Sequence, residues 1–203
     1  YIGSHTCIQL LSAGHEVVVL DNLSNSSVES LARVQALAAK KLDFVEGDIL
    51  DQQILDQIFQ HHSIDAVIHF AGLKAVGESQ KEPLKYFENN ISGSISLVKA
   101  MERAQVFKLV FSSSATVYDE ANISPLNETM PTGMPSNNYG YTKLIVEQLL
   151  QKAALADARW SIALLRYFNP VGAHKSGCIG EDPQGIPNNL MPYITKVAVG
   201  QLQ

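Results

Sequence analysis

Two residues with complementary chemistry, Tyr139 and Lys143, stand four positions apart in the sequence. At this spacing two side chains share one face of a helix, so the ammonium group can lie beside the phenol. A neighbouring positive charge favours the phenolate and lowers the pKa of a tyrosine from its ordinary value of about 10. Such a pair could take a proton from a substrate and return it. A simple contact on a helix surface has the same spacing and stays an alternative.

A run of hydroxyl side chains, residues 112–114, precedes this pair by about 25 positions. It follows the apolar residues 109–111, so we expect Ser112 and Ser114 at the carboxyl end of a strand. In a sheet of parallel strands, ligands bind at this edge. The combination favours an active site built from Ser114, Tyr139 and Lys143 over a surface pair.

The elements that must hold these residues alternate regularly. Short apolar runs rich in β-branched residues predict strands at residues 16–20, 42–45, 66–70, 108–112 and 161–165. Amphipathic stretches between them predict helices at residues 27–39, 51–62, 83–104 and 136–158. Continuous apolar strands are typical of a parallel sheet that helices cover on both faces. We therefore predict an α/β fold with a doubly wound, mostly parallel, Rossmann-like sheet.

The pattern changes at about residue 169, where loops rich in glycine and proline begin. We assign residues 1–168 to a dinucleotide-binding domain and residues 169–203 to the beginning of a smaller substrate-binding region. The chain opens at Tyr1 directly in a helical pattern and stops just past another helix. We expect both ends to be truncated, with the first strand and the glycine-rich turn of the fold upstream of Tyr1.

Two features near the start of the chain indicate a dinucleotide cofactor. Gly3 precedes a helix, and Asp21 ends the strand that follows this helix. In dinucleotide folds the last glycine of the phosphate-binding turn and the ribose-binding acid occupy these two positions. A carboxylate at Asp21, with no arginine just after it, disfavours a 2′-phosphate and predicts NAD rather than NADP. Aspartate is also a common turn residue at a strand end. Asp48 ends the next strand, where it could meet adenine or cap the following helix.

Composition excludes several other classes of function. The 203 residues carry a net charge of −5 and no cluster of lysine and arginine, which makes a nucleic-acid binder a poor interpretation. There is no long apolar run and no signal-peptide pattern, so we expect neither a membrane segment nor export. Cys7 and Cys178 lie far apart and match no metal-binding spacing. They predict ordinary thiols in a reducing compartment, the cytoplasm, and no metal site.

Five stretches of sequence carry a resemblance to a known family. Residues 70–79, residues 111–118 and the Tyr-x-x-x-Lys motif at 139–143 resemble the extended short-chain dehydrogenases/reductases. Residues 166–174 and 180–192 narrow this resemblance to the bacterial-type 4-epimerases of UDP-galactose and UDP-glucose. The similarity covers essentially the whole chain. One departure is Asp119, where the family usually has glycine.

The resemblance implies an NAD-dependent, reversible epimerisation at C4 of UDP-galactose/UDP-glucose through a transient 4-keto-sugar, a step of galactose metabolism. It also implies a homodimer. Two alternatives stay open: another nucleotide-sugar epimerase of this family, acting on UDP-N-acetylhexosamine or UDP-glucuronate, or an NAD-binding module without turnover for this stretch alone. A dehydratase is disfavoured, because the resembling dehydratases have an Asp-Glu pair where this chain has Ala115-Thr116.

The resemblance also implies a role for individual residues. The catalytic residues are Ser114, Tyr139 and Lys143. The NAD contacts are Ile2, Asp21, Asn22, Asn25, Ser26, Asp48, Ile49, Phe70, Ala71, Gly72, Lys74, Asn89, Ser112, Tyr139, Lys143, Tyr167 and Phe168. The contacts with the UDP-sugar are Lys74, Ser114, Tyr139, Asn169, Asn189 and Leu190. For the loop asparagines, a role as turn formers is an equally good interpretation.

Overall fold

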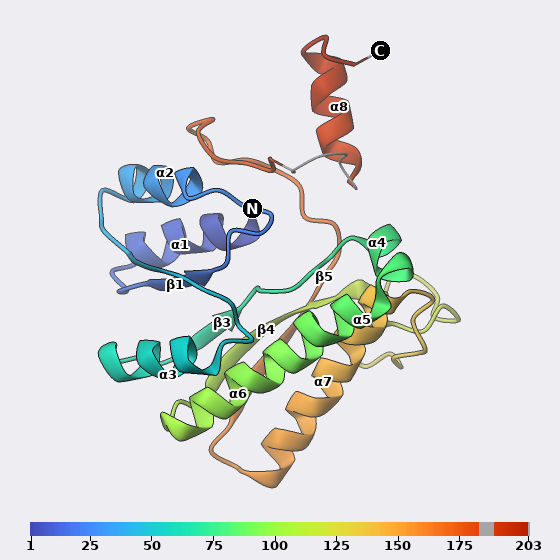
Figure 1. Cartoon of the computed structure of the whole chain (residues 1–203). Coiled ribbons are helices and arrows are strands. Elements are labelled where there is room, and N and C mark those ends of the chain that lie inside the picture. The colour runs from blue at the N-terminus through green and yellow to red at the C-terminus, as the bar shows by residue number, and fades with distance from the viewer. Residues whose placement is uncertain (183–188, 203) are drawn as a thin grey trace. The chain divides into compact units, whose positions relative to one another are not determined.

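The structure is a computed structural model that describes residues 1–182 and 189–202. Its contacts divide the chain into two compact units. One unit combines Tyr1–Gly47 with Asn169–Gln203, and the other is Asp48–Phe168. Each unit holds a parallel sheet of its own (Figure 1).

The first unit is built on a two-stranded parallel sheet with Val18 opposite Asp43. Two helices close its core, in which Ile8 and Leu11 of one pack with Val34 of the other and with Ile179. The 3.6-residue periodicity of these apolar positions explains why the segments form helices with one buried face. The elements of this unit are α1 (Ile2–Ser12), β1 (Val18–Asp21), α2 (Glu29–Ala38), β2 (Asp43–Glu46) and α8 (Leu190–Ala198).

The second unit is built on three parallel strands in the order β3-β4-β5. The strands are β3 (Val67–His69), β4 (Lys108–Ser114) and β5 (Ser161–Tyr167). Lys108 lies opposite Ser161 in the β4–β5 pair. The helices are α3 (Gln52–His61), α4 (Val76–Lys81), α5 (Pro83–Tyr86), α6 (Gly93–Arg103) and α7 (Asn138–Ala156). Side chains at the N-caps define two helix starts: Asp51 accepts hydrogen bonds from two amides of α3, and Asn137 accepts one from α7.

The predicted helix at residues 83–104 is divided in the structure. A π-helical turn, Phe87–Ser92, separates α5 from α6. Such a turn accommodates one residue more than α-helical geometry allows and often lies at a functional site. Asn89 and Asn90 are both in this turn, and Asn90 is only 4% exposed. The sequence pattern therefore gave the position of the helix but not its irregularity.

The mixed α/β fold with parallel strands agrees with the sequence prediction. All five predicted strands are present, and the helices predicted at residues 27–39, 51–62 and 136–158 are present as well, with ends shifted by a few residues. The stretch 83–104 is helical but divided by the π-helical turn. The short helix α4 was not predicted. The assignment of residues 1–168 to dinucleotide binding stays a prediction. Asp119 is absent from the residues with positive φ, so glycine's freedom is not needed there.

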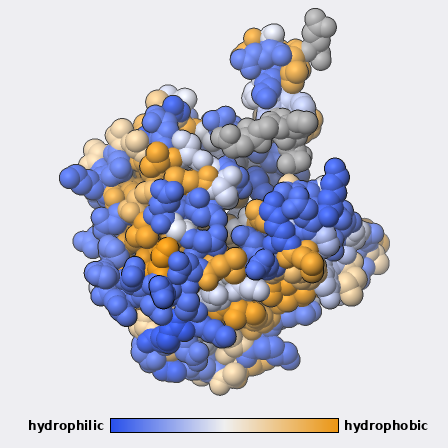
Figure 2. Space-filling view, in the orientation of Figure 1, coloured by the Kyte–Doolittle hydropathy of each residue, from blue (hydrophilic) through white to orange (hydrophobic). Residues whose placement is uncertain are grey.

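The surface agrees with the amphipathic pattern of the helices. Hydrophilic residues dominate the face seen in Figure 2, and hydrophobic residues form smaller patches between them. Among the described residues, no helix combines the length and the hydropathy needed to cross a bilayer.

Candidate active site

The start of α7 is fastened in a way that fixes Tyr139. Asn137 caps the helix by accepting a hydrogen bond from the Gly140 amide at 2.8 Å. The hydroxyl of Ser79, on α4, accepts a hydrogen bond from the Tyr139 amide at 3.1 Å. Asn138 donates its side-chain amide to the Ser79 carbonyl at 2.9 Å. These hydrogen bonds hold the first turn of α7 in a fixed position relative to α4. The Tyr139 side chain therefore extends from a rigid part of the helix.

Lys143 lies one helical turn after Tyr139 and is almost fully buried, with 5% of its surface exposed. Its ammonium donates a hydrogen bond to the Ser112 carbonyl of β4 at 2.7 Å. The same nitrogen lies 4.8 Å from the centre of the Phe111 ring and 6.0 Å from the centre of the Tyr139 ring. Burial lowers the pKa of Lys143 from 10.5 to about 8, because the charged form loses hydration.

For the protein groups alone the pKa of Tyr139 moves upward, and a lowered pKa with the nicotinamide ring bound stays a prediction. Burial raises the pKa of Tyr139 above its ordinary value, and a hydrogen bond with Ser114 lowers it by a smaller amount. The physical reason is the burial of the phenol itself, because the ionised form loses hydration. In this arrangement Ser114, not Lys143, is the group that favours the phenolate.

A short 3₁₀ turn, Ala115–Val117, orients the Ser114 hydroxyl. The Ser114 oxygen accepts hydrogen bonds from the Thr116 amide at 3.3 Å and from the Thr116 hydroxyl at 3.0 Å. With its oxygen occupied as an acceptor, Ser114 has its own proton to donate, and its effect is to lower the pKa of the nearby Tyr139 phenol. Sequence reasoning missed Thr116. The Ser-x-Thr spacing after a strand is the signal that could have found it.

The loop after β3 closes against the same lysine. Gly72 has φ +154°, and a Cβ there would lie 3.3 Å from Asn90 Oδ1 and 3.6 Å from Lys143 Nζ. Asn90 holds the loop by accepting from the Leu73 amide at 2.8 Å and donating to the Leu73 carbonyl at 3.0 Å. The same amide group donates to Thr142 of α7 at 3.0 Å. The structure thus brings Gly72, Ser112, Ser114, Tyr139 and Lys143 together.

His69, at the end of β3, is a buried neutral residue beside this cluster. Its Nε2 lies 2.9 Å from the Ser94 hydroxyl, which itself donates to the Asn90 carbonyl at 2.6 Å. Because Ser94 uses its proton on Asn90, His69 Nε2 must be the donor. Burial, and to a lesser degree the charge of Lys143, lowers the pKa of His69 from 6.5 to about 3.

This histidine predicts a sensitivity to acid. The unfolded chain protonates its histidine below pH 6.5 whereas the folded chain does so only near pH 3, so stability falls as the pH drops through this window. Between pH 6.5 and 5 we expect a loss of about 2 kcal/mol in the free energy of unfolding. Urea unfolding of His69→Gln, which keeps an amide donor for Ser94, should lack this part of the slope. An unchanged slope would contradict the assignment.

The residues predicted to hold the adenosine end lie mostly in the first unit. Asp21 ends β1, and its Oδ1 accepts from the Leu23 amide at 2.8 Å and from the Ser26 hydroxyl at 2.9 Å. Asn22 accepts from the Ser24 amide at 3.1 Å, and Asn25 is exposed. Ile2 is the first residue of α1. The structure thus brings Asp21 and Ser26 into direct contact, in a loop tightened by the positive φ of Leu23.

Further predicted cofactor residues flank the three-stranded sheet. Asp48 accepts from the Leu50 amide at 2.8 Å, and Asp51, not Asp48, is the N-cap of α3. The alternative role of Asp48 as the helix cap is therefore excluded. Ile49 is buried against Gly93. The remaining residues of this set are in the loop after β3 (Phe70, Ala71 and the exposed Lys74) and in the π-helical turn, where the Asn89 amide donates to Asn90 at 2.9 Å.

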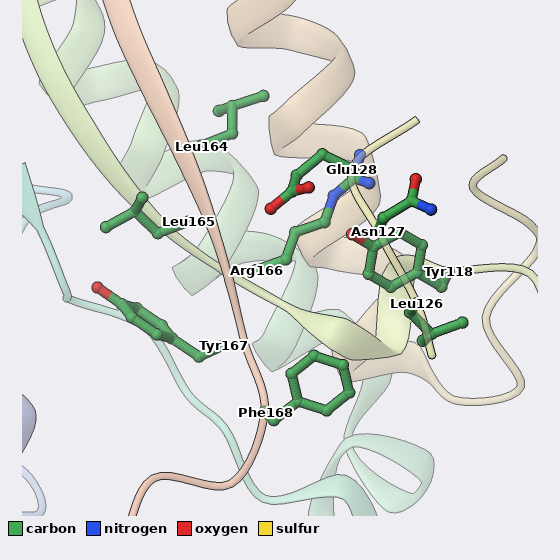
Figure 3. A pocket seen from close by; sticks show the side chains of 9 residues that line it. All are labelled: Tyr118, Leu126, Asn127, Glu128, Leu164, Leu165, Arg166, Tyr167 and Phe168. Carbon is green, nitrogen blue, oxygen red and sulfur yellow. The ribbon is translucent and has the colours of Figure 1, made fainter. Parts of the chain in front are cut away.

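The end of β5 borders a pocket of about 470 Å³ (Figure 3). Tyr167 and Phe168 extend from the strand to opposite sides, as successive strand residues do (Figure 3). Phe168 lies on the side of Tyr118 and Leu126 and is 64% exposed. Burial raises the pKa of Tyr167. The two aromatic residues, predicted together beside the cofactor, thus face different surroundings.

The residues predicted to contact the sugar nucleotide belong to the segment after β5. Asn169 is exposed, and Leu190, the first residue of α8, is 71% exposed. Asn189 donates its amide to the Glu181 carboxylate at 2.6 Å. Part of the sequence motif at 180–192 lies outside the described residues. These three residues stay predictions as substrate contacts.

Residues 1–202 match the NAD dependent epimerase/dehydratase family. The chain belongs to this family. The UDP-glucose 4-epimerase of Bacillus subtilis (strain 168) is 60% identical over 203 residues, which are 100% of this chain and 60% of that protein. The chain therefore spans about 60% of the length of the curated relatives it matches.

Solved structures show the same likeness. The UDP-glucose 4-epimerase of Bifidobacterium longum in complex with NAD+ and UDP has a TM-score of 0.97 at 49% identity, over 100% of this chain and 61% of that one. The enzyme of Stenotrophomonas maltophila, with bound NAD and formylated UDP-arabinopyranose, has a TM-score of 0.96 at 53% identity, over 100% and 60%. These matches confirm the resemblance that the sequence motifs carried.

The residues of the site fit the cofactor of an NAD dependent epimerase/dehydratase. An ammonium has three donors, and Lys143 directs one of them to Ser112, so others can reach ribose hydroxyls. Gly72 keeps the space beside that ammonium open, because any larger residue would place a Cβ 3.6 Å from it. The hydrogen bonds from Leu23 and Ser26 both reach Oδ1 of Asp21. Its Oδ2 is the oxygen suited to accept a hydrogen bond from a hydroxyl of the adenosine ribose.

Proposed function

We propose that the protein interconverts UDP-galactose and UDP-glucose by NAD-dependent, reversible epimerisation at C4, through a transient 4-keto-sugar. Its membership of the NAD dependent epimerase/dehydratase family supports the cofactor and the reaction class. The 60% identity with the enzyme of Bacillus subtilis supports the substrate. The observation that carries the proposal is the placement of Tyr139 and Lys143 one turn apart on α7, with the Lys143 ammonium hydrogen-bonded to Ser112 of β4 and Ser114 of the same strand acting on the phenol.

The predicted cofactor contacts fall into two groups by their proposed roles. Asp21 and Ser26, with Ile2, Asn22 and Asn25, would bind the adenosine end, and Asp48 and Ile49 would flank adenine. Gly72, Ser112, Lys143 and Tyr167 would line the nicotinamide end, together with Phe70, Ala71, Lys74, Asn89, Tyr139 and Phe168. When bound, NAD supplies the oxidation and re-reduction at the sugar carbon.

Tyr139 would handle the proton of the sugar 4-hydroxyl. Its phenolate takes the proton when the carbon is oxidised and returns it when the carbon is reduced. Ser114 donates a hydrogen bond that favours the phenolate, and its own oxygen is held by Thr116. Lys143 would bind the ribose next to the nicotinamide, where its positive charge lies behind the Tyr139 ring.

The remaining assignments are part of the same proposal. Asn169, Asn189 and Leu190 would contact the UDP-sugar, with Lys74 beside the phosphates. Residues 169–203 would begin the substrate-binding region. We also propose that the protein is a homodimer and that it works in the cytoplasm, where Cys7 and Cys178 would stay reduced.

The reaction can be tested with the protein that carries this chain. Incubated with UDP-galactose and NAD, it should produce UDP-glucose until the two sugars reach equilibrium, which proton NMR of the anomeric signals measures directly. UDP-N-acetylglucosamine and UDP-glucuronate in parallel incubations decide between this substrate and its relatives. Conversion of one of these two sugars, without conversion of UDP-galactose, would overturn the proposed substrate. No conversion of any sugar would overturn the proposed function.

A further inference from the structure

The proposed chemistry leaves one buried ionisable residue of α7 without a role. Glu147 lies one helical turn after Lys143 and two turns after Tyr139, and only 1% of its surface is exposed. An ionised carboxylate is costly to bury unless it is paired and hydrogen-bonded. Its partners should therefore explain why the chain places a charge at this depth.

Glu147 is held by two neighbouring strands. Arg166 of β5 contacts it with two nitrogens, Nη2 to Oε2 at 2.8 Å and Nε to Oε1 at 3.0 Å. This paired geometry is directional and fixes the carboxylate in one plane. Ser113 of β4 donates its hydroxyl to the same Oε1. The Arg166 guanidinium also stacks on the Tyr118 ring at 4.7 Å, just beyond the 3₁₀ turn that orients Ser114.

These contacts complete a repeating pattern between α7 and β4. Ser114 faces Tyr139 closely enough to lower the pKa of its phenol, and the Ser112 carbonyl accepts a hydrogen bond from Lys143 at 2.7 Å. Ser113, the residue between the two serines, meets Glu147. Three consecutive strand residues thus contact three helix residues spaced by one turn each. A slide or rotation of α7 along β4 would break all three contacts together, and Glu147 is the one of the three helix residues that Arg166 also fastens to β5.

We propose that Glu147 is a positioning residue for the acid–base site. Clamped by Arg166 and Ser113, it sets the register of α7 on β4 at which the Tyr139 hydroxyl faces Ser114. The proposal rests on the proposed function only in that Tyr139 is taken to be the base. A misplacement of about 1 Å can cost about 100-fold in rate, so the clamp should influence turnover without touching the substrate.

Three substitutions test the clamp. Glu147→Ala should lower kcat about 100-fold and change KM less than threefold. Glu147→Gln keeps an acceptor for Ser113 and should recover most of the lost turnover. Ser113→Ala changes no charge and should lower kcat about tenfold even if Glu147→Ala folds poorly. Leu150→Ala, which truncates a buried side chain one turn further along α7, is the control for loss of stability alone.

A second measurement needs no turnover. The titration of Tyr139 can be followed by tyrosinate absorbance, as the difference between each variant and the same variant carrying Tyr139→Phe. Loss of the Ser114 contact should raise the pKa of Tyr139 in Glu147→Ala and in Ser113→Ala, but not in Leu150→Ala. Removal of the negative charge alone would lower it. The direction of the change in the pKa of Tyr139 therefore distinguishes a positioning role of Glu147 from an effect of its charge alone.

The proposed role of Glu147 and the proposed function can be overturned independently of one another. If Glu147→Ala loses no more kcat than Leu150→Ala, or if the pKa of Tyr139 does not rise, Glu147 is not a positioning residue. If the unaltered protein epimerises no UDP-sugar, the proposed function fails, and the tyrosine titration still decides the role of Glu147.

Discussion

Tyr139→Phe should lower kcat by about 10³-fold and leave the fold intact, because a positioned acid–base group contributes about 10² to 10⁴ in rate. Phenylalanine keeps the ring that lies 6.0 Å from the Lys143 nitrogen and removes only the hydroxyl whose pKa Ser114 lowers. KM for UDP-galactose should change little, since the lost group acts on the proton in transit rather than on binding. Steady-state kinetics with UDP-galactose measures both parameters.

A neighbouring tyrosine offers a matched control. Tyr141 lies two positions further on α7 and stacks edge-on against the Phe87 ring at 5.9 Å, away from Ser114. Tyr141→Phe makes the same chemical change in the same helix, and we expect kcat within about twofold of the unaltered protein, because this hydroxyl is not the proton carrier. If Tyr139→Phe also turned over at nearly the normal rate, Tyr139 could not be the base.

Lys143→Met should make the protein more stable and far less active. A buried ammonium whose pKa is lowered from 10.5 to about 8 opposes folding, and a methionine of similar length fills the same space without a charge. The shift corresponds to about 3 kcal/mol, and loss of the hydrogen bond to Ser112 returns about 1 kcal/mol. A net gain of about 2 kcal/mol in the free energy of unfolding is therefore expected.

The gain should depend on pH in a defined direction. Below about pH 8 the folded protein carries the buried charge, so the advantage of methionine is complete. It shrinks as the pH rises towards 10.5, because the lysine of the unfolded chain then loses its proton as well. Urea unfolding at pH 7 and pH 10 measures the difference. A variant that is less stable than the unaltered protein at pH 7 would contradict this account of Lys143.

The loss of activity in the same variant is expected from its position. Lys143 is the buried cation of the site and the proposed ligand of the nicotinamide ribose. NAD affinity, measured by calorimetry, should fall at least tenfold, because a hydrogen-bonded charge is lost from the contact. Such a trade of stability against function is common where an active site holds an unfavourable group in place.

Much of the scaffold could be predicted from local sequence. The β-branched run 17–20 and the apolar run 109–111 became strands because burial on both faces rewards such residues. Asn137 became a helix cap because its side chain can satisfy an otherwise unpaired amide. The four-residue spacing of Tyr139 and Lys143 put both on one face of a real helix, as the pattern indicated.

Other features depend on pairs that no local pattern reveals. Glu147 and Arg166 are 19 positions apart, and only the packing of α7 on β5 joins them. Asn90 forms hydrogen bonds with Leu73, 17 positions earlier in the sequence, and with Thr142, 52 positions later. The upward pKa shift of Tyr139 in the chain alone is of the same kind, since desolvation depends on everything packed around the phenol.

The π-helical turn between α5 and α6 has a consequence for insertions and deletions in this stretch. Each residue of an α-helix advances the chain by about 100° around the axis. Removing one residue from Phe87–Ser92 would convert the turn to regular α-helix without interrupting it. Because the wider turn absorbs the extra residue, the parts of the helix before and after the deletion would keep nearly the same relative rotation, whereas the side chains within the turn, Asn90 among them, would be displaced. Chain length at this point, more than composition, therefore decides whether the Asn90 amide still meets its partners in both directions.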